Sequence, residues 1–260
     1  MSPYKNILTH FDQGVFTITL NREHKRNAID EQTMDELQDV LTNFPVDEGA
    51  RLAVIRGKGK DFCAGADLDW MRTTQGMDEQ QLSLQNMKLQ KVFELWFDLP
   101  VFTIAIIHGN VVGGAIGLVA SSDMVVASAE TRFRFSEVTL GLVPATIAPF
   151  VLQRTRSRFV RNAMLTAMTF RTDKALEHGL VDRVIDYGQE QSIIDDCLEA
   201  LNKTSAGAVS ETKKLCNDLI FNRIDEPLDT YTTALLAKVR KTEAAAQRIE
   251  GFFQSIEKKG

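Results

Sequence analysis

Residues 104–120 read IAIIHGNVVGGAIGLVA, and this stretch decides the fold. The continuous apolar run that ends at Ile107 is typical of a strand covered on both faces. The apolar residues from Gly113 to Ala120 favour a short buried helix. Four of the 16 glycines lie within nine residues here, at Gly109, Gly113, Gly114 and Gly117. The sequence therefore predicts a strand, a glycine-rich turn and a helix in immediate succession.

The same alternation of strands and helices extends to both sides of this stretch. Apolar and β-branched residues predict strands at 15–20, 52–55 and 124–127. Helical spacing after Asp30, and again over 78–98, predicts two amphipathic helices, the second stopped by Pro100. Such alternation is typical of α/β layers with parallel strands. Only helical patterns follow residue 190, so we predict a core over residues 1–190 and a helical region over 191–260.

Composition excludes several classes of protein. The chain has 260 residues, with 30 Lys and Arg against 35 Asp and Glu, a net charge of −5 that argues against a nucleic-acid binder. The most apolar stretch, residues 104–120, is interrupted by His108, Asn110 and four glycines, which argues against a membrane span. Three cysteines without zinc-type spacing predict neither a disulfide framework nor a metal site. We expect a soluble cytoplasmic protein.

Two loops follow predicted strands and are rich in small residues. One carries Gly113 and Gly114, and the other is Asp61–Asp67, with the sequence DFCAGAD. Each loop can direct one backbone N–H at a shared oxygen atom, as an oxyanion hole requires. The alternative is structural: the glycines allow a helix to pack closely on a strand, and Asp67 is an ordinary helix N-cap.

Several motifs occur in the order found in one known family. They are Asn21-Arg22 with Asn27-Ala28, FCAGAD at 62–67, His108-Gly109 with Gly113-Gly114, Ser122-Asp123, FSEVTLGLVP at 135–144 and GLV at 179–181. In these motifs the chain resembles the enoyl-CoA hydratase/isomerase (crotonase) family. The stretches 62–71 and 142–149 resemble most the branch that hydrates branched, carboxylated enoyl thioesters such as methylglutaconyl-CoA and carboxygeranoyl-CoA. The resemblance implies a crotonase-type spiral of ββα units followed by a helical C-terminal trimerisation region.

The resemblance also implies a set of site residues. The thioester oxygen of an acyl-CoA would lie between the N–H groups of Ala66 and Gly114. Main-chain atoms of Ala28 and Ala64 would meet the adenine, and Ala66–Asp69, which includes Asp67, Leu68 and Asp69, would line the CoA arm. Coenzyme A would enter as part of the substrate, with no separate cofactor. A homotrimer or a dimer of trimers is the implied assembly.

Hydratases of this family hold one water between two glutamates. The second glutamate corresponds to Glu137, whose pKa would rise in apolar surroundings, as suits a proton carrier. The first would stand three residues after Gly114, where this chain has Gly117. Glu137 could act alone, Asp69 could supply a second acid, or the reaction could need only one base.

Three functions follow from this interpretation. The first is an enoyl-CoA hydratase that adds water to the α,β double bond of an acyl-CoA thioester. The second is a single-glutamate enoyl-CoA isomerase or decarboxylase that uses the same oxyanion hole. The third is a non-catalytic acyl-CoA-binding homologue, an option that Gly117 leaves open and Glu137 argues against.

Overall fold

The computed structural model describes residues 3–155, 158–186 and 188–257. Its larger sheet has the strand order β1-β2-β3-β4-β6-β9. β1 pairs with β2 antiparallel, whereas every later pair is parallel. The strands are β1 (Ile7–Asp12), β2 (Val15–Leu20), β3 (Leu52–Gly57), β4 (Phe102–Ile107), β6 (Met124–Ser128) and β9 (Arg183–Ile185).

A smaller sheet stands beside the larger one. Its order is β5-β7-β8, with β7 parallel to β5 and antiparallel to β8. Its strands are three residues long, too short to show an alternating pattern, and they were therefore not predicted. They are β5 (Asn110–Val112), β7 (Arg132–Arg134) and β8 (Thr169–Arg171).

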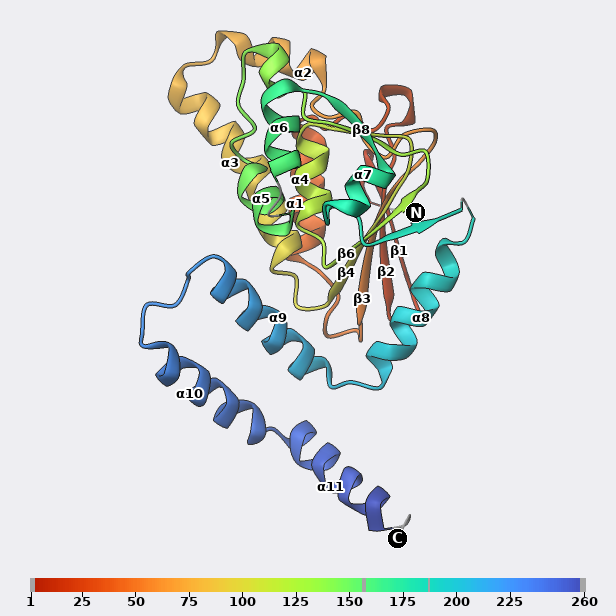
Figure 1. The fold of residues 1–260 in the computed structure, drawn as a ribbon, viewed down its shortest axis with the longest axis vertical. Helices are drawn as coiled ribbons and strands as arrows, with labels where there is room; N and C mark the ends of the chain where they lie inside the picture. The colour runs from red at the N-terminus through yellow and green to blue at the C-terminus, as the bar shows by residue number, and fades with distance from the viewer. Residues whose placement is uncertain (1–2, 156–157, 187, 258–260) are drawn as a thin grey trace.

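Helices cover one face of the larger sheet and enclose the main core (Figure 1). Both predicted amphipathic helices begin after an aspartate cap: Asp30 accepts a hydrogen bond from Thr33 N, and Asp78 accepts one from Gln81 N. Trp96 and Phe93 are fully buried on this face. The helices are α1 (Glu31–Thr42), α2 (Leu68–Thr73), α3 (Glu79–Phe97), α4 (Gly114–Ala120), α5 (Ala148–Thr155), α6 (Arg158–Thr166) and α7 (Thr172–Glu177).

The opposite face of the sheet is covered by α8 (Glu190–Asn202). Its Ile194 packs with Leu52, Val54 and Ile104 in a second hydrophobic cluster. Next, α9 (Ala206–Ile220) returns to the core, where Asn217 Nδ2 donates to Phe97 O at 3.0 Å. The C-terminal part of the chain thus contributes two helices to the packing of the core.

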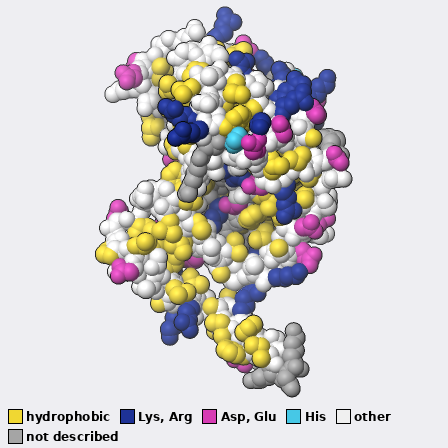
Figure 2. All heavy atoms as spheres, viewed as in Figure 1, with side chains coloured by type: hydrophobic (Ala, Val, Ile, Leu, Met, Phe, Trp, Pro, Cys, Tyr) yellow, Lys and Arg dark blue, Asp and Glu magenta, His cyan; other side chains and the backbone are white. Residues whose placement is uncertain are grey.

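The last two helices form an arm that extends away from the core (Figure 1). They are α10 (Leu228–Arg240) and α11 (Glu243–Glu257), and none of their described residues is buried. Figure 2 shows hydrophobic side chains gathered on the surface of this arm. Those on α11 that are about half exposed are Ile249, Phe252, Phe253 and Ile256.

Candidate active site

Two loops from different parts of the chain are joined by their backbones. Cys63 N donates to Asn110 O and Val112 N donates to Cys63 O, both at 3.1 Å, which ties residues 61–67 to β5. Gly65 adopts φ +95°, and a Cβ on it would lie 2.9 Å from Val112 O. Only glycine fits this crossing. The two loops that the sequence predicted to converge therefore lie side by side.

The two proposed donors occupy chain positions where a backbone N–H is left free. Ile29 donates to Gly65 O and Asp67 donates to Ile29 O, both at 2.8 Å, so these bonds bracket Ala66. Within the described ranges, no backbone carbonyl accepts from Ala66 N–H. Gly114 is the first residue of α4, and an N–H there has no partner inside its helix.

Ala66 and Gly114 both line two cavities that meet at the loops. The larger cavity, of about 740 Å³, extends along α2 and α3. The smaller cavity, of about 620 Å³, extends past Ala28 and Ala64. A ligand could therefore occupy both cavities, with one atom next to the two loops. The residues that line both are Ala66, Leu68, Met71, Gly114, Glu137, Leu140 and Leu142.

Glu137 begins the 3₁₀ turn Glu137–Leu140 and lines both cavities. Burial raises the pKa of its carboxyl above the usual value for glutamate, and this outweighs the backbone hydrogen bond that lowers the pKa. Its Oε2 is buried without a hydrogen-bond partner among the described atoms. A carboxyl group in this state is suited to accept and return a proton.

The position of the first family glutamate is closed off in this chain. A Cβ on Gly117 would lie 2.5 Å from Ile147 Cγ2 and 2.9 Å from the Phe93 ring. Gly117 is fully packed inside α4 and lines neither cavity. The larger cavity receives its one carboxyl group, among the described residues, from Glu137. Asp69 lines only the smaller cavity and pairs with Lys25 at 2.5 Å.

The other predicted CoA-binding residues all line the smaller cavity: Ala28, Ala64, Asp67, Leu68 and Asp69. The Asp67 side chain caps α2 and binds Arg22 at 2.9 Å. Burial acts to raise the pKa of Asp67, but the hydrogen bonds from Arg22, Trp70 N and Asp69 N outweigh it and hold the pKa below its usual value. Asp67 is thus an ionised helix N-cap that also pairs with Arg22, in agreement with the structural alternative stated for it in the sequence analysis.

Sequence reasoning missed two basic residues at the smaller cavity. Lys25 and Arg26 line it next to Ala28. Arg26 adopts φ +53°, and its side chain binds Asp61 at 2.7 Å. This ion pair holds the turn at Arg26 against the loop formed by residues 61–67. The run His24-Lys25-Arg26 before Asn27-Ala28 was the available signal. These cations can attract the phosphates of an anionic ligand.

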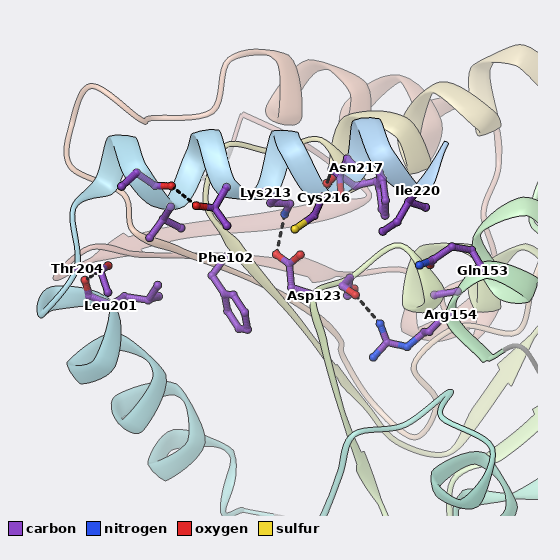
Figure 3. A pocket seen from close by; sticks show the side chains of 16 residues that line it. Phe102, Asp123, Gln153, Arg154, Leu201, Thr204, Lys213, Cys216, Asn217 and Ile220 are labelled. Atoms are coloured by element: carbon purple, nitrogen blue, oxygen red, sulfur yellow. Dashed lines mark hydrogen bonds and ion pairs between the residues drawn. The ribbon is translucent and has the colours of Figure 1, made fainter. Parts of the chain in front are cut away.

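A third cavity, here called the α9 cavity and drawn in Figure 3, shares no lining residue with the other two. It measures about 620 Å³ and lies between α9 and the core. Lys213 of α9 reaches Asp123 at 2.7 Å and Val101 O at 3.0 Å. Asp123 also accepts from the N–H and hydroxyl of Thr103. These groups are all paired with one another, so we interpret the cluster as structural. It attaches α9 to the beginning of β4.

Cys63 is close in sequence to the proposed donor Ala66, but its thiol is unreactive. Its side chain is fully buried, and burial raises the pKa of the thiol to about 12. A thiol with this pKa is not a nucleophile near neutral pH. No group of three His, Cys, Asp or Glu in residues 3–155, 158–186 and 188–257 is placed to hold a metal ion. In the same ranges, the helices are too short or too polar to cross a membrane.

Together these features define a class of chemistry. Backbone donors near a bound carbonyl stabilise the oxyanion of an enolate, and a desolvated carboxyl group moves a proton on the adjacent carbons. A family model described as enoyl-CoA hydratase/isomerase matches residues 10–259. The chain therefore belongs to the enoyl-CoA hydratase/isomerase (crotonase) family, and the predicted α/β crotonase fold is confirmed.

Three relatives illustrate the range of the family. An enoyl-CoA hydratase structure from Shewanella pealeana has 31% identity and a TM-score of 0.91, over 97% of this chain and 95% of that one. A putative enoyl-CoA hydratase from Thermus thermophilus has 26% identity over 92% of this chain and 94% of its own. A trans-2-decenoyl-[acyl-carrier-protein] isomerase from Streptococcus mutans has 29% identity over 82% and 81%.

Proposed function

We propose that the protein is an enoyl-CoA hydratase that works with Glu137 as its single catalytic carboxyl group. The observation that carries the proposal is the buried carboxyl of Glu137 beside the Gly113–Gly114 turn, in the larger cavity, where no second acid from the described residues lies. Hydration, rather than another reaction of an enoyl thioester, is supported by the relatives that are named as enoyl-CoA hydratases. The narrower resemblance to hydratases of branched, carboxylated substrates stays a prediction.

One carboxyl group is chemically sufficient for this addition. The Glu137 carboxylate takes a proton from water as the water oxygen bonds to C3 of the enoyl group. The π electrons move to the thioester oxygen, where the N–H groups of Ala66 and Gly114 stabilise the enolate. Protonated Glu137 then returns the proton to C2. Because the same group acts in both steps, the elements of water add to one face, and Glu137 ends ionised.

Isomerisation is a second candidate, and the packed Gly117 favours it. Moving a double bond requires one base to carry a proton between C2 and C4, and no water has to be activated. The isomerase relative from Streptococcus mutans also supports this reaction. Hydration and isomerisation would share the oxyanion hole and Glu137. They differ in the bonds that change: hydration adds a water oxygen to C3, whereas isomerisation only moves a proton between C2 and C4.

The test is product analysis with paired substrates in D₂O. A hydratase bleaches the ultraviolet absorbance of crotonyl-CoA and gives the 3-hydroxyacyl product with one deuterium at C2. An isomerase converts a 3-enoyl-CoA into the conjugated 2-enoyl-CoA without adding water. Including 3-methylglutaconyl-CoA tests the narrower prediction. An enzyme inert toward all three substrates, yet able to bind CoA esters, would favour the non-catalytic homologue.

We further propose that a second copy of the chain covers the α10–α11 arm. The support is its exposed apolar face together with the absence of buried residues on either helix in the described part of the chain. A homotrimer or a dimer of trimers would bury this face. Light scattering after size-exclusion chromatography tests the proposal, and a monomer at micromolar concentration contradicts it.

A further inference from the structure

Three buried side-chain polar atoms in the described residues have no hydrogen-bond partner. They are Glu137 Oε2, Trp70 Nε1 and Gln85 Oε1. All three residues line the larger cavity. Buried polar groups in proteins are nearly always paired, so unpaired ones require an explanation. The chemistry above uses Glu137, which leaves one buried donor and one buried acceptor without a partner, on two residues that line the same cavity.

The two remaining atoms have fixed and opposite characters. The indole Nε1 of Trp70 can only donate a hydrogen bond. The Nε2 of Gln85 donates to Glu31 Oε1 at 3.0 Å, and Lys88 donates to the same oxygen at 2.8 Å. Turning the amide over would place the Gln85 oxygen against a carboxylate. Gln85 Oε1 is therefore held as an acceptor.

The walls of the larger cavity differ in polarity. Residues 140–144 contribute only apolar side chains. Helices α2 and α3 contribute apolar side chains as well, but they also supply the polar groups Trp70, Arg72, Gln85 and Asn86. A cavity of about 740 Å³ is in the range that holds ligands of drug-like size. It offers far more room than the short chain of a crotonyl group needs.

We propose, on the basis of the proposed function, that the acyl group of the natural substrate carries a hydroxyl group beyond its double bond. Trp70 Nε1 donates to the hydroxyl oxygen, and Gln85 Oε1 accepts from the hydroxyl hydrogen. A hydroxyl group supplies both partners at once, whereas a carboxylate has no hydrogen to donate and would place one acceptor oxygen against another at Gln85. Trp70 and Gln85 are thus specificity-determining residues rather than catalytic ones.

Binding of saturated acyl-CoA esters tests the proposal, because these esters cannot be hydrated. Calorimetry would compare decanoyl-CoA with a series of hydroxydecanoyl-CoA esters hydroxylated at successive carbons from C5 to C10. We expect at least one of them to bind the wild-type protein about tenfold more tightly than decanoyl-CoA. Trp70→Phe and Gln85→Leu should each remove most of that preference while still binding decanoyl-CoA.

Gln90→Leu is the matched control, since Gln90 is exposed on α3, does not line the larger cavity, and donates to Glu94 at 2.9 Å. This variant should retain the wild-type preference. The proposal is overturned if no hydroxylated ester binds more tightly than decanoyl-CoA, or if the preference survives in both site variants. A stronger preference for a dicarboxylic acyl-CoA that Arg72→Leu removes would also overturn it.

Failure of the proposed function is seen in a separate measurement. Hydration of crotonyl-CoA by the wild-type protein tests the reaction, whereas the binding series tests only the acyl chain. A protein that prefers the hydroxylated esters but does not hydrate crotonyl-CoA would retain the inference about the ligand and lose the hydratase. The unfolding midpoints of Trp70→Phe and Gln85→Leu confirm that both variants are folded.

Discussion

The carboxyl group of Glu137 lies directly against Gly113: a Cβ placed on this glycine would be 3.3 Å from Glu137 Oε1. Gly113 also adopts φ +54°, a conformation that side chains rarely tolerate. The residue before the proposed donor Gly114 therefore sets both the backbone turn and the space for the carboxyl group. The proton carrier and one oxyanion donor share a single structural support.

Glu137→Gln should abolish most of the activity and leave binding intact. Glutamine retains the size and hydrogen-bonding reach of glutamate but cannot carry the proton. We expect kcat to fall by about 10²–10⁴-fold, with acyl-CoA affinity close to that of the wild type. Steady-state kinetics and calorimetry measure the two quantities. Full activity in this variant would remove Glu137 from the mechanism.

The pH dependence of hydration should report the raised pKa of Glu137. The base must be ionised to take a proton from water, so kcat/KM falls as the pH drops through this pKa. Because burial raises the pKa, the fall should begin at a higher pH than for an exposed glutamate. A pH profile of kcat/KM between pH 4 and 9 measures it, and a profile that is flat down to pH 4 contradicts the assignment.

The same pKa shift predicts how the stability of Glu137→Gln depends on pH. A raised folded-state pKa stabilises the protein below the unfolded-state pKa, and that contribution disappears as the pH rises through the folded-state pKa. The glutamine variant carries no charge to bury. It should therefore be more stable than the wild type at neutral pH, and the difference should vanish in acid. Urea unfolding at several pH values provides the comparison.

Gly114→Pro should remove one oxyanion donor without disrupting the helix. Proline lacks the N–H, yet it is favoured at the first position of a helix. A Cβ at Gly114 would meet Leu89 Cδ2 at 3.5 Å, an ordinary contact. We expect kcat to fall by about 10²–10³-fold. Gly114→Ala retains the N–H and is the control, and equal losses in both variants would mean that the N–H contributes nothing.

Gly117→Glu should destabilise the protein rather than restore a second acid. Ile147 and Phe93 already fill the space that the side chain would enter. Overpacking alone costs about 1–3 kcal/mol, and the buried charge adds to this. Gly207→Glu is the control, because a Cβ there points into open space among the described residues, with no tertiary contact within 4 Å. A stable Gly117→Glu variant with increased hydration would contradict this packing.

Lys213→Met should weaken the attachment of α9 to the core. Burial lowers the pKa of Lys213, but its contact with Asp123 acts in the opposite direction. The side chain of Lys213 is 8% exposed and that of Asp123 is 26% exposed, so water can hydrate the carboxylate that loses its partner. We expect a loss of about 1.5–3 kcal/mol in unfolding free energy, the range for hydrogen bonds to charged groups. Lys203→Met breaks only the exposed pair with Glu199 and should change stability by less than about 1 kcal/mol. Urea unfolding distinguishes the two variants.

Periodicity predicted the elements that bury a full face. Strand β4 and the helix after Asp78 formed as expected, because their apolar spacing is set by packing against the core. Strand β1 was missed because polar residues such as His10 and Asp12 occupy its exposed positions. The turn at Gln13 and Gly14, both with positive φ, then pairs β1 with β2 antiparallel.

The site was predictable where it depends on backbone geometry and not where it depends on the cavity walls. Two loops of small residues after predicted strands indicated a shared oxyanion hole, and the family resemblance assigned its donors to Ala66 and Gly114, which line the same cavities. Trp70 and Gln85 gave no signal, since a tryptophan or glutamine in a helical pattern looks the same whether or not its polar atom is paired. Only the three-dimensional packing distinguishes those cases.

Both proposed oxyanion donors are main-chain N–H groups, so few amino-acid substitutions can remove them. A single substitution deletes a catalytic side chain, but only proline deletes an N–H. A substitution at Ala66 or Gly114 by any residue except proline therefore leaves the N–H donor in place, as long as the turns at Gly65 and Gly113 keep their conformations. The acid–base chemistry, by contrast, depends on one side chain, Glu137. New reactions on this scaffold can arise by replacing the proton carrier while the enolate remains stabilised.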